Sequence, residues 1–375
     1  MSDFKFGQLL EREDICDREQ EIKILQKITA TRGRCVVYGP RRYGKTSVVK
    51  NVVMADFLAS AKKSFAVYCD LFQLDSSEDL VSRLQTALEL ALSQKAKIKQ
   101  FFQSLQNYIR NFKIELSPDP LSGTPSISLS GQHVHNEKSL PELFAVINAL
   151  THDYKTLLIF DEFQDITNVP TLEAKLRSEL QSLNQTAIIL LGSKQHVLSD
   201  IFNNEKRPFY GFGIDVEFSK IPLALWTPYI QKRFATHDMK IDKNSVAEIC
   251  QLMRNVPNAI QEFCQWISMQ IPAHTQIDIL TIRECLTHLI ENKASRYLEH
   301  FAQLSVKEKR ILLAIAKMEP VTSSTSTDFL QASKVSATAI RAAVRRFTDS
   351  GLIDHSQIGY ALTDPLFRHY LLYQF

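Results

Sequence analysis

Along the first half of the chain, short apolar runs alternate with longer amphipathic stretches, which is typical of a parallel sheet covered by helices. The apolar runs are rich in Val, Ile, Leu or Phe without strict alternation, which predicts strands buried on both faces. The expected strands are residues 34–39, 64–71, 156–162 and 186–193, and the expected helices are about 45–61, 77–109, 139–150 and 171–183. We therefore predict an α/β fold, with the sheet lying between two layers of helices in a three-layer αβα domain.

One stretch interrupts this rhythm. Residues 112–138 contain the segments FKIEL and SISLS and carry three prolines and two glycines. Because Pro and Gly mark turns, we expect a β-hairpin or a protruding loop inserted into the sheet domain. His133 and His135 lie in this stretch, but two histidines are an incomplete set of ligands for a metal ion. We therefore interpret them as part of a solvated loop.

After Pro222 the strand signal fades and helical patterns take over. From about residue 304 a helix, a turn, a second amphipathic helix and the segment GLIDHSQIGYALTD follow one another, which is the order of a winged helix-turn-helix. We predict three domains. They are a sheet domain over residues 1–221, a helical lid over 222–303 and a winged helix over 304–375.

Composition fits an ordinary soluble globular chain, with 375 residues, 45% hydrophobic and 23% charged. No segment approaches the roughly 18 consecutive apolar residues that cross a bilayer, and the N-terminus lacks the layout of a secretory signal. We therefore expect a cytoplasmic protein without a membrane partner. Six cysteines without a CxxC pair indicate reduced, structural thiols. A net charge of +3 is too small to indicate nucleic acid binding by itself.

The segment GPRRYGKTS follows the apolar run CVVY and precedes a helix, and it meets the phosphate-loop pattern GxxxxGK[ST]. Its glycines let the backbone wrap the phosphates, and its amides and the helix dipole point at the anion. Lys45 adds a positive charge, and the Thr46 hydroxyl can bind Mg²⁺. We expect the whole loop to contact the nucleotide, namely Gly39, Pro40, Arg41, Arg42, Tyr43, Gly44, Lys45, Thr46 and Ser47.

A P-loop site also needs an acidic residue at the end of another buried strand. The run TLLIFDE supplies Asp161, which together with Thr46 would hold Mg²⁺, and Glu162 follows directly. Neighbouring residues of a strand point to opposite sides, so Glu162 could reach a water beyond the γ-phosphate. This arrangement predicts hydrolysis, with Glu162 and Lys45 as catalytic residues. The other interpretation is an acidic N-cap or loop pair.

Three further side chains have two interpretations each. Ser193 ends the run TAIILLGS, where a small polar side chain could sense the γ-phosphate or could be a plain turn residue. Arg41 and Arg42 would project away from the enclosed phosphates. They could reach solvent, a lid or another subunit, or they could pack on the edge of the sheet.

These motifs resemble the archaeal-type ATPase family, which belongs to the STAND class of P-loop NTPases and is AAA+-like. Four stretches carry the resemblance, namely ICDREQEIKIL (15–25), GPRRYGKTS (39–47), NNEKRPFYGF (203–212) and LTDPLFRHYL (362–371). The resemblance implies ATP and Mg²⁺ as ligands, a sheet order of 5-1-4-3-2, a helical lid and a terminal winged helix. It also implies that Asp17, Arg18 and Glu19 lie near the nucleotide.

The chain departs from the family pattern at two places. Phe212 stands where the family has an arginine, so Arg207 is only a nearby candidate for that role. The lid motif Gly-x-Pro is replaced by Asn255, Val256 and Pro257. Because Asn tolerates a left-handed backbone, we expect the turn to persist and Pro257 to contact the nucleotide.

This layout favours an ATP-controlled switch, in which nucleotide holds the lid and the winged helix in one pose and slow hydrolysis releases them. Arg341 and Arg345 lie on the polar face of the second winged-helix helix, which suits contact with DNA. The alternative for this module is packing or docking onto a protein partner. An alternative for the whole chain is an oligomeric AAA+-type ATPase that helps in DNA replication, transposition or defence. No arginine finger is evident in the sequence, and the preference for ATP rests on the resemblance.

Overall fold

The computed structural model describes residues 4–93, 113–118, 125–130, 140–356 and 358–375. Its main sheet is parallel and contains β1 (Arg34–Tyr38), β2 (Ser64–Asp70), β5 (Lys155–Asp161), β6 (Thr186–Gly192) and β7 (Ile214–Glu217). The strand order is β2-β5-β6-β1-β7. When these five strands are numbered 1 to 5 along the chain and the sheet is read from β7 to β2, the order is the expected 5-1-4-3-2. The sequence did not reveal β7, because this edge strand has four residues of which only Val216 is buried.

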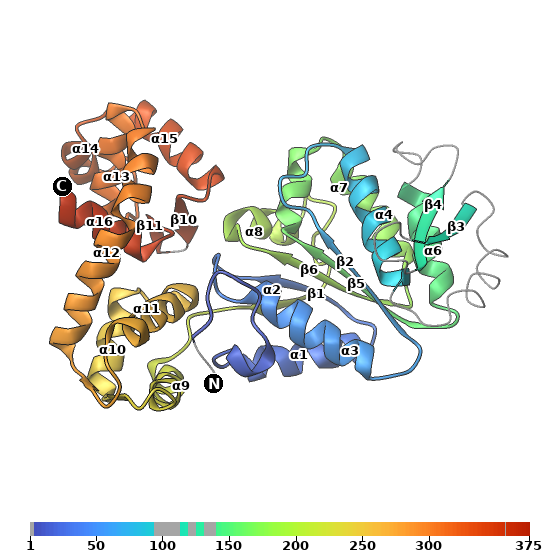
Figure 1. Ribbon diagram of the computed structural model, residues 1–375. Helices are drawn as coiled ribbons and strands as arrows, with labels where there is room; N and C mark the ends of the chain where they lie inside the picture. The colour runs from blue at the N-terminus through green and yellow to red at the C-terminus, as the bar shows by residue number, and fades with distance from the viewer. Residues whose placement is uncertain (1–3, 94–112, 119–124, 131–139, 357) are drawn as a thin grey trace.

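Helices cover both faces of the sheet, which confirms the predicted three-layer arrangement (Figure 1). On one face lie α1 (Glu19–Ala30) and a continuous helical run of α2 (Lys45–Ser47), the π-helical η2 (Val48–Met54) and α3 (Ala55–Ala59). On the other lie α4 (Ser77–Ser93), α6 (Leu140–Leu150), α7 (Leu172–Ser182) and α8 (Gln195–Asn203). Each face has its own hydrophobic core. Alternate side chains of the strands point into each core, which explains why the strands read as continuous apolar runs.

The predicted hairpin is present as an antiparallel pair of β3 (Lys113–Pro118) and β4 (Pro125–Ser130). It lies beside α4 and α6, at the end of the sheet domain far from the C-terminus (Figure 1). His133 and His135 lie outside the described residues, as does the part of the predicted helix from residue 94 to 109.

The second half of the chain contains two helical units. The first has α9 (Leu223–Ala235), α10 (Lys243–Leu252), α11 (Pro257–Gln270), α12 (Ile279–Ala302) and a short parallel pair of β8 (Lys240–Ile241) and β9 (Gln276–Ile277). The second is the winged helix, with α13 (Val306–Met318), α14 (Thr327–Ser333), α15 (Ala337–Asp349), β10 (Ile353–Ser356), β11 (Gly359–Leu362) and α16 (Pro365–Gln374). The strands β10 and β11 form the antiparallel wing.

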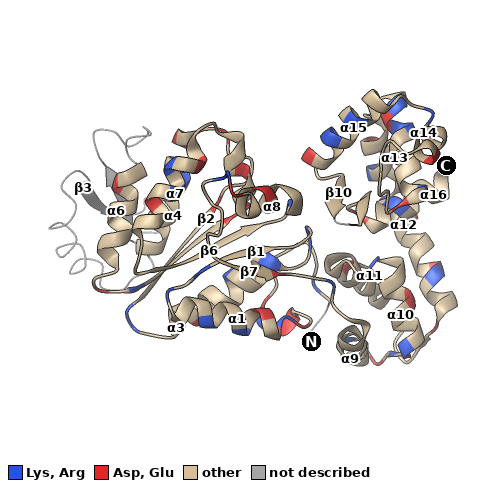
Figure 2. Ribbon diagram, turned by 180° about the vertical axis from the view of Figure 1, so that it is seen from behind, with Lys and Arg blue, Asp and Glu red and all other residues tan. Residues whose placement is uncertain are grey.

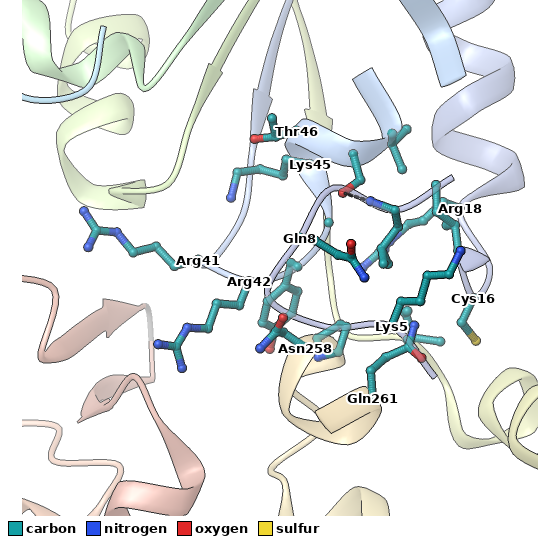
Figure 3. A pocket seen from close by; sticks show the side chains of 18 of the residues that line it. Lys5, Gln8, Cys16, Arg18, Arg41, Arg42, Lys45, Thr46, Asn258 and Gln261 are labelled. Atoms are coloured by element: carbon teal, nitrogen blue, oxygen red, sulfur yellow. Dashed lines mark hydrogen bonds between the residues drawn. The ribbon is translucent and has the colours of Figure 1, made fainter. Parts of the chain in front are cut away.

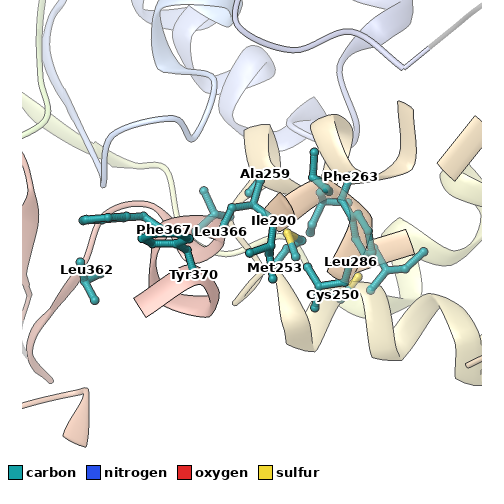
Figure 4. Close-up of a cluster of buried hydrophobic side chains, with 14 of the residues drawn as sticks. Cys250, Met253, Ala259, Phe263, Leu286, Ile290, Leu362, Leu366, Phe367 and Tyr370 are labelled. Atoms are coloured by element: carbon teal, nitrogen blue, oxygen red, sulfur yellow. The ribbon is translucent and has the colours of Figure 1, made fainter. Parts of the chain in front are cut away.

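The two units share one hydrophobic core. Side chains of α16, such as Phe367 and Tyr370, lie beside Met253 at the end of α10 and Ile290 of α12 (Figure 4). The ring of Tyr297 in α12 lies 5.0 Å from the ring of Phe367, in a tilted arrangement. Separating the winged helix from the lid would expose this apolar surface to water, which is unfavourable. The lid and the winged helix are therefore coupled through their packing.

The N-terminal segment also packs on the lid. The ring of Phe4 lies 5.0 Å from that of Phe234 in α9. Asp14 is buried and forms an ion pair of 3.2 Å with Arg233, while its carbonyl accepts a hydrogen bond of 2.6 Å from Tyr229. Residues before the first strand thus bridge the sheet domain and the lid, a connection that the sequence pattern did not indicate.

Candidate nucleotide site

The phosphate loop is shaped by two glycines. At Gly39 φ is 153°, and a Cβ there would lie 2.6 Å from the carbonyl oxygen of Phe218, so a larger residue would displace the backbone. Gly44 has the left-handed φ of 84° and precedes the first helical turn, Lys45–Ser47. The free amides of this turn point toward the loop, as in other anion sites at helix N-termini.

Lys45 is buried, and its ammonium donates hydrogen bonds of 2.8 Å to the carbonyls of Gly39 and Pro40. Burial lowers the pKa of Lys45 to about 8, and the nearby carboxylates of Glu162 and Asp161 oppose this shift. An anion next to the ammonium would favour its charged form. Lys45 is therefore placed to respond to a phosphate group.

The metal-ligating pair expected from the sequence is brought together. The Thr46 hydroxyl donates a hydrogen bond of 2.7 Å to Asp161, which also accepts a bond of 2.7 Å from the hydroxyl of Tyr68. Burial raises the pKa of Asp161, while these hydrogen bonds act to lower it. A hydroxyl and a carboxylate at this separation are the hard oxygen ligands that Mg²⁺ binds in P-loop sites, so the donor set fits a magnesium ion.

Glu162 reaches the site by a different route from the one expected. The strand β5 ends at Asp161, and Glu162 has a left-handed backbone with φ of 49° and ψ of 42° at the start of a 3-10 helix, η4 (Phe163–Asn168). Strand alternation therefore does not apply at Glu162. The left-handed turn instead directs its carboxylate to the same edge of the sheet as that of Asp161, and Glu162 lines the cavity next to Lys45 and Thr46.

Ser193 contacts Glu162. Its hydroxyl donates a hydrogen bond of 2.8 Å to one carboxylate oxygen, Oε2, and the amide of Gln164 donates a second bond of 2.6 Å to the same atom. The backbone N–H of Ser193 in turn donates to Gln164 Oε1 at 3.3 Å. Ser193 is thus more than a turn residue, because it orients the predicted catalytic carboxylate. Gln164 is a site residue that the sequence analysis missed, since no motif marks its position.

Arg41 and Arg42 reach the winged helix, which was not among the expected destinations. Arg41 Nε donates to Ser193 Oγ at 3.4 Å, and its guanidinium lies against Gly351. Arg42 lies 3.6 Å from the carboxylate of Asp364 at the start of α16. In Figure 3 both arginines point away from Lys45 and Thr46 toward the winged-helix ribbon. Arg42 therefore faces the winged helix, whereas Arg41 contacts both the winged helix and Ser193 at the end of β6.

A cavity of about 290 Å³ opens beside the loop, between the sheet domain and the lid. Its far wall includes residues that no motif marked, namely Lys5, Gln8, Asn258 and Gln261 (Figure 3), together with Trp226. They come from the N-terminal segment, α9 and α11, which lie far from the loop in sequence. Pro257 lines the same cavity at the first turn of α11. The cavity is the volume in which the rest of a nucleotide would lie.

Arg18 lines this cavity as well, but its guanidinium is held by the protein. It donates to Glu21 and to the carbonyl of Ser219, both at 2.7 Å, and lies over the ring of Phe218. Asp17 and Glu19 are not among the described residues that line the cavity. The stretch ICDREQEIKIL (15–25) therefore contributes three wall residues, Ile15, Cys16 and Arg18, and the main contacts of Arg18 support the neighbouring backbone.

The lid turn adopts the conformation expected of its sequence. Arg254 and Asn255 have left-handed φ values of 53° and 57°, so Asn255 replaces the family glycine without losing the turn. This turn leads into α11, where the backbone N–H of Asn258 donates to the Arg42 carbonyl at 3.4 Å. The lid thus touches the phosphate loop directly. Tyr43 of the loop is in turn buried in the core that the lid and the winged helix share.

Arg207, the candidate for the family's arginine, lies away from the cavity. Arg207 forms ion pairs with Glu173 at 2.9 Å and Asp200 at 3.4 Å, and it does not line the cavity. Phe212 is buried among aromatic rings of the sheet domain, including Phe202 and Phe209. The segment linking sheet to lid therefore contributes packing rather than a charge to this site.

The winged helix keeps the predicted faces of α15. Ile340, Ala343, Val344 and Phe347 are buried, whereas Arg341, Arg345 and Arg346 are exposed. Basic side chains recur along this helix (Figure 2). Arg346 pairs with Glu308 of α13, and Arg345 lies 3.9 Å from Asp349. The helix therefore presents a basic surface whose charge is partly balanced by its own neighbours.

The matches to known families fit this architecture. Residues 15–198 match the family described as an ATPase domain predominantly from Archaea, and residues 295–373 match a probable winged helix domain. The part of the chain that holds the phosphate loop is therefore similar to this archaeal-type ATPase domain, and the C-terminal part is similar to a winged helix domain. No curated protein matches the chain.

Solved structures share the fold across nearly the whole chain. The Walker-type ATPase PABY2304 of Pyrococcus abyssi superposes with a TM-score of 0.65 at 21% identity, covering 98% of this chain and 99% of its own. The ORC1 protein of Aeropyrum pernix in complex with DNA superposes with a TM-score of 0.51 at 13% identity, covering 96% of this chain and 93% of its own. The ORC2 protein of the same organism, in ADPNP and ADP complexes, superposes with a TM-score of 0.52 at 13% identity, covering 99% of this chain and 97% of its own. At these identities the likeness establishes the fold alone.

Other kinds of site have less support in the structure. Within the described ranges, no three His, Cys, Asp or Glu side chains gather as a metal site. All six cysteines are buried and unpaired by disulfides. None of the helices that the structure describes has the length and apolar character needed to span a membrane.

Proposed function

We propose that this chain binds ATP with Mg²⁺, hydrolyses it slowly, and uses the bound nucleotide to fix the position of the lid and winged helix relative to the sheet. The observation that carries the proposal is that one loop contacts all three parts. Lys45 lies beside Glu162 just after β5, Tyr43 is buried in the core of the lid and winged helix, and Arg42 faces Asp364 of the winged helix. Binding of a triphosphate to this loop would change contacts in every part at once.

In this proposal the loop amides and Lys45 bind the phosphates, and Thr46 and Asp161 hold Mg²⁺ between them. The ion supplies positive charge where the leaving phosphate becomes more negative. Glu162 accepts a proton from the attacking water, and Ser193 orients Glu162. Pro257 and Arg18, which line the cavity, would form walls of the pocket that encloses the nucleotide.

A nucleotide switch has a definite energetic requirement. Moving a two-state equilibrium from 1:99 to 99:1 takes about 5.5 kcal/mol of differential affinity. Contacts to the loop amides, Lys45 and the lid are together large enough to supply it, because each charge-assisted hydrogen bond contributes about 1.5–3 kcal/mol. This behaviour is the one that the STAND class implies. We also propose that the domains are residues 1–221, 222–303 and 304–375, with the N-terminal segment packed on the lid.

The experiment that tests the proposal compares Lys45→Ala with Glu162→Gln. Lys45→Ala should abolish nucleotide binding, because it removes the only buried cation of the described phosphate loop. Glu162→Gln should retain binding, measured by calorimetry with ATP and Mg²⁺, but should slow hydrolysis by about 10²–10⁴-fold. Equal loss of binding in both variants would contradict the role of Glu162. Thermal unfolding of each variant checks that it is folded.

The exposed arginines of α15 support a second part of the proposal, in which the winged helix contacts DNA through Arg341 and Arg345. One structural neighbour was solved in complex with DNA, and in helix-turn-helix modules the second helix lies in the major groove, which supports a similar role for α15 here. The other outcome is a protein partner on the same surface. An oligomeric AAA+-type helper would instead assemble on addition of ATP, which sizing chromatography with and without ATP would detect.

A further inference from the structure

Beyond the phosphate loop, the cavity between the sheet domain and the lid has several apolar walls. Cys16, Ile221 and Trp226 line it, and all three side chains are buried. Such surroundings suit a flat aromatic group, and in a mostly apolar pocket a few polar atoms decide which ligand is accepted. The polar atoms of this wall therefore indicate what the cavity can distinguish.

Gln261 on α11 lines the cavity, and its neighbours fix the orientation of its amide. The amide nitrogen donates hydrogen bonds of 3.1 Å to the carbonyl of Asp14 and of 2.9 Å to the hydroxyl oxygen of Tyr229. The Tyr229 hydroxyl directs its own hydrogen to the same Asp14 carbonyl, at 2.6 Å, so its oxygen can only accept from Gln261. Turning the amide round would bring two acceptors together. The nitrogen of Gln261 therefore faces Asp14 and Tyr229, and its oxygen, Oε1, faces elsewhere.

Gln261 Oε1 is a buried acceptor that has no donor within the described ranges, and the residue is only 3% exposed. Buried acceptors are unfavourable when they stay unpaired, and most of them have a partner. In Figure 3 the side chain extends from the lid helix toward Lys5, but the Lys5 ammonium pairs with Asp14 at 2.7 Å. A ligand that brings an N–H group to this wall would supply the missing donor.

Trp226 on α9 presents the opposite kind of unpaired group to the same cavity. Its side chain is 1% exposed, and its indole Nε1–H has no acceptor among the residues that the structure describes. An indole N–H can only donate. The walls of the cavity therefore offer one unpaired acceptor, from Gln261, and one unpaired donor, from Trp226.

Adenine carries the matching pair of groups. Its 6-amino group donates hydrogen bonds, and the ring nitrogens on either side of that group, N1 and N7, accept them. In guanine the group at the same position is a carbonyl oxygen, which would place an acceptor against Gln261 Oε1. A purine that has only hydrogen at this position would leave Oε1 unpaired. The substituent at position 6 is therefore what this wall can distinguish.

We propose that Gln261 selects adenine nucleotides by accepting a hydrogen bond from the 6-amino group of the base, while Trp226 Nε1 donates to a neighbouring ring nitrogen. The contacts of Gln261 with Tyr229 and Asp14 hold its oxygen ready for the base. The phosphate loop cannot make this distinction, because all nucleoside triphosphates have the same phosphates. This inference rests on the proposed nucleotide binding and identifies the residues that select the base.

The test compares ATP with purine riboside triphosphate, which lacks only the 6-amino group, by calorimetry on the full chain with Mg²⁺. The wild type should bind ATP at least about tenfold more tightly, because the analogue leaves a buried acceptor unpaired. Gln261→Leu should bind the two nucleotides with nearly equal affinity. The matched control is Gln265→Leu, the same change at a half-buried position one turn further along α11 and outside the cavity. It should keep the wild-type ratio of affinities.

Trp226→Phe separates the selection of the 6-amino group from general damage to the wall. This change removes the indole N–H but keeps a ring. Both nucleotides retain N1 and N7, so both should bind more weakly by the same factor, and the ratio should persist. Thermal unfolding checks that each variant is folded.

The inference is overturned if the wild type binds ATP and the analogue with equal affinity, a result that needs no variant. It is also overturned if folded Gln261→Leu keeps the wild-type ratio. The proposed function fails separately, if no nucleotide binds in a manner that depends on Lys45. Binding of both nucleotides that depends on Lys45 but does not distinguish them rejects only the inference.

Discussion

The hydroxyl of Tyr68 donates a hydrogen bond of 2.7 Å to the carboxylate of Asp161 on the neighbouring strand. Asp161 is buried, and burial raises its pKa, so the donors around it decide how readily it stays ionised. Only the ionised carboxylate attracts a divalent cation strongly. Tyr68, which no motif marks, therefore supports the predicted magnesium ligand.

Replacing Tyr68 with Phe should raise the Mg²⁺ concentration needed for half-maximal ATP hydrolysis by several fold. The pKa of Asp161 would rise further, because a donor to its charged form is lost. The free energy of unfolding should fall by about 1 kcal/mol, as for other lost hydrogen bonds. Tyr38→Phe is the matched control, since Tyr38 lies on β1 and lines a different cavity. An unchanged magnesium requirement in Tyr68→Phe would show that Asp161 does not depend on this donor.

Nucleotide affinity should fall as pH rises above about 8. Burial lowers the pKa of Lys45 to about 8, so the free protein loses the ammonium charge above that pH. Triphosphate binds the charged form, and binding is therefore strongest below this pKa and weakens above it. Between pH 7 and pH 9 the affinity measured by calorimetry should decrease by about tenfold. In Lys45→Arg the guanidinium stays protonated, so its affinity should not change over this range, and an equal slope in both proteins would contradict the prediction.

Tyr43 should couple the phosphate loop to the lid. Its side chain is 6% exposed and belongs to the hydrophobic core of the lid and winged helix. Tyr43→Ala would leave a cavity there and should lower the free energy of unfolding by about 3 kcal/mol in urea denaturation, while also weakening nucleotide binding. Tyr43→Phe keeps the ring and should change both quantities little. Identical behaviour of the two variants would mean that the packing of this ring does not hold the lid.

The junction between the lid and the winged helix depends on a buried carboxylate. Glu319 accepts bonds of 2.8 Å from Arg254 of the lid turn, from Arg368 of α16 and from the backbone N–H of Leu362. Removing one partner of a buried ion pair typically destabilises by about 3–5 kcal/mol. Glu319→Gln should therefore lower the thermal midpoint clearly. Glu299→Gln changes an exposed glutamate on α12 and should have little effect; a similar loss in both would argue against a special role for Glu319.

Much of this architecture could be predicted from the sequence, because it depends on local patterns. The apolar runs marked four of the five strands, and the phosphate-loop pattern placed Lys45 and Thr46 correctly beside Asp161. The edge strand β7 was missed, since it buries a single residue. Glu162 was expected to face the site through strand alternation, whereas a left-handed turn directs it there. Such a turn leaves no mark in an apolar pattern.

The remaining site residues depend on contacts between distant segments. Gln8, Asn258 and Gln261 line the cavity only because the N-terminal segment and α11 fold back over the loop. Arg41 meets Gly351 for the same kind of reason. These contacts form only when the whole chain is packed, so the spacing of residues within a motif does not predict them. The predicted positions of nearby residues were therefore more reliable than the predicted destinations of long side chains.

DNA binding by the winged helix should depend on salt and on two arginines. Arg341 and Arg345 are exposed on α15, and each phosphate contact that they make releases counterions. The double substitution Arg341→Ala and Arg345→Ala should weaken binding to a labelled duplex in fluorescence anisotropy. It should also reduce the slope of log affinity against log salt by about 2, because each contact contributes about 0.9.

The matched control removes the same charge from another surface. Lys23 and Lys27 are exposed on α1, in the sheet domain, and their double substitution by Ala changes the net charge equally. If the winged helix reads DNA, only the α15 variant should lose affinity, since local contacts rather than total charge decide the slope. Equal losses in both would indicate a general electrostatic attraction. If the wild type does not bind DNA measurably, a protein partner for α15 is favoured instead. The exposed arginines would then contact an acidic surface of that partner rather than DNA phosphates.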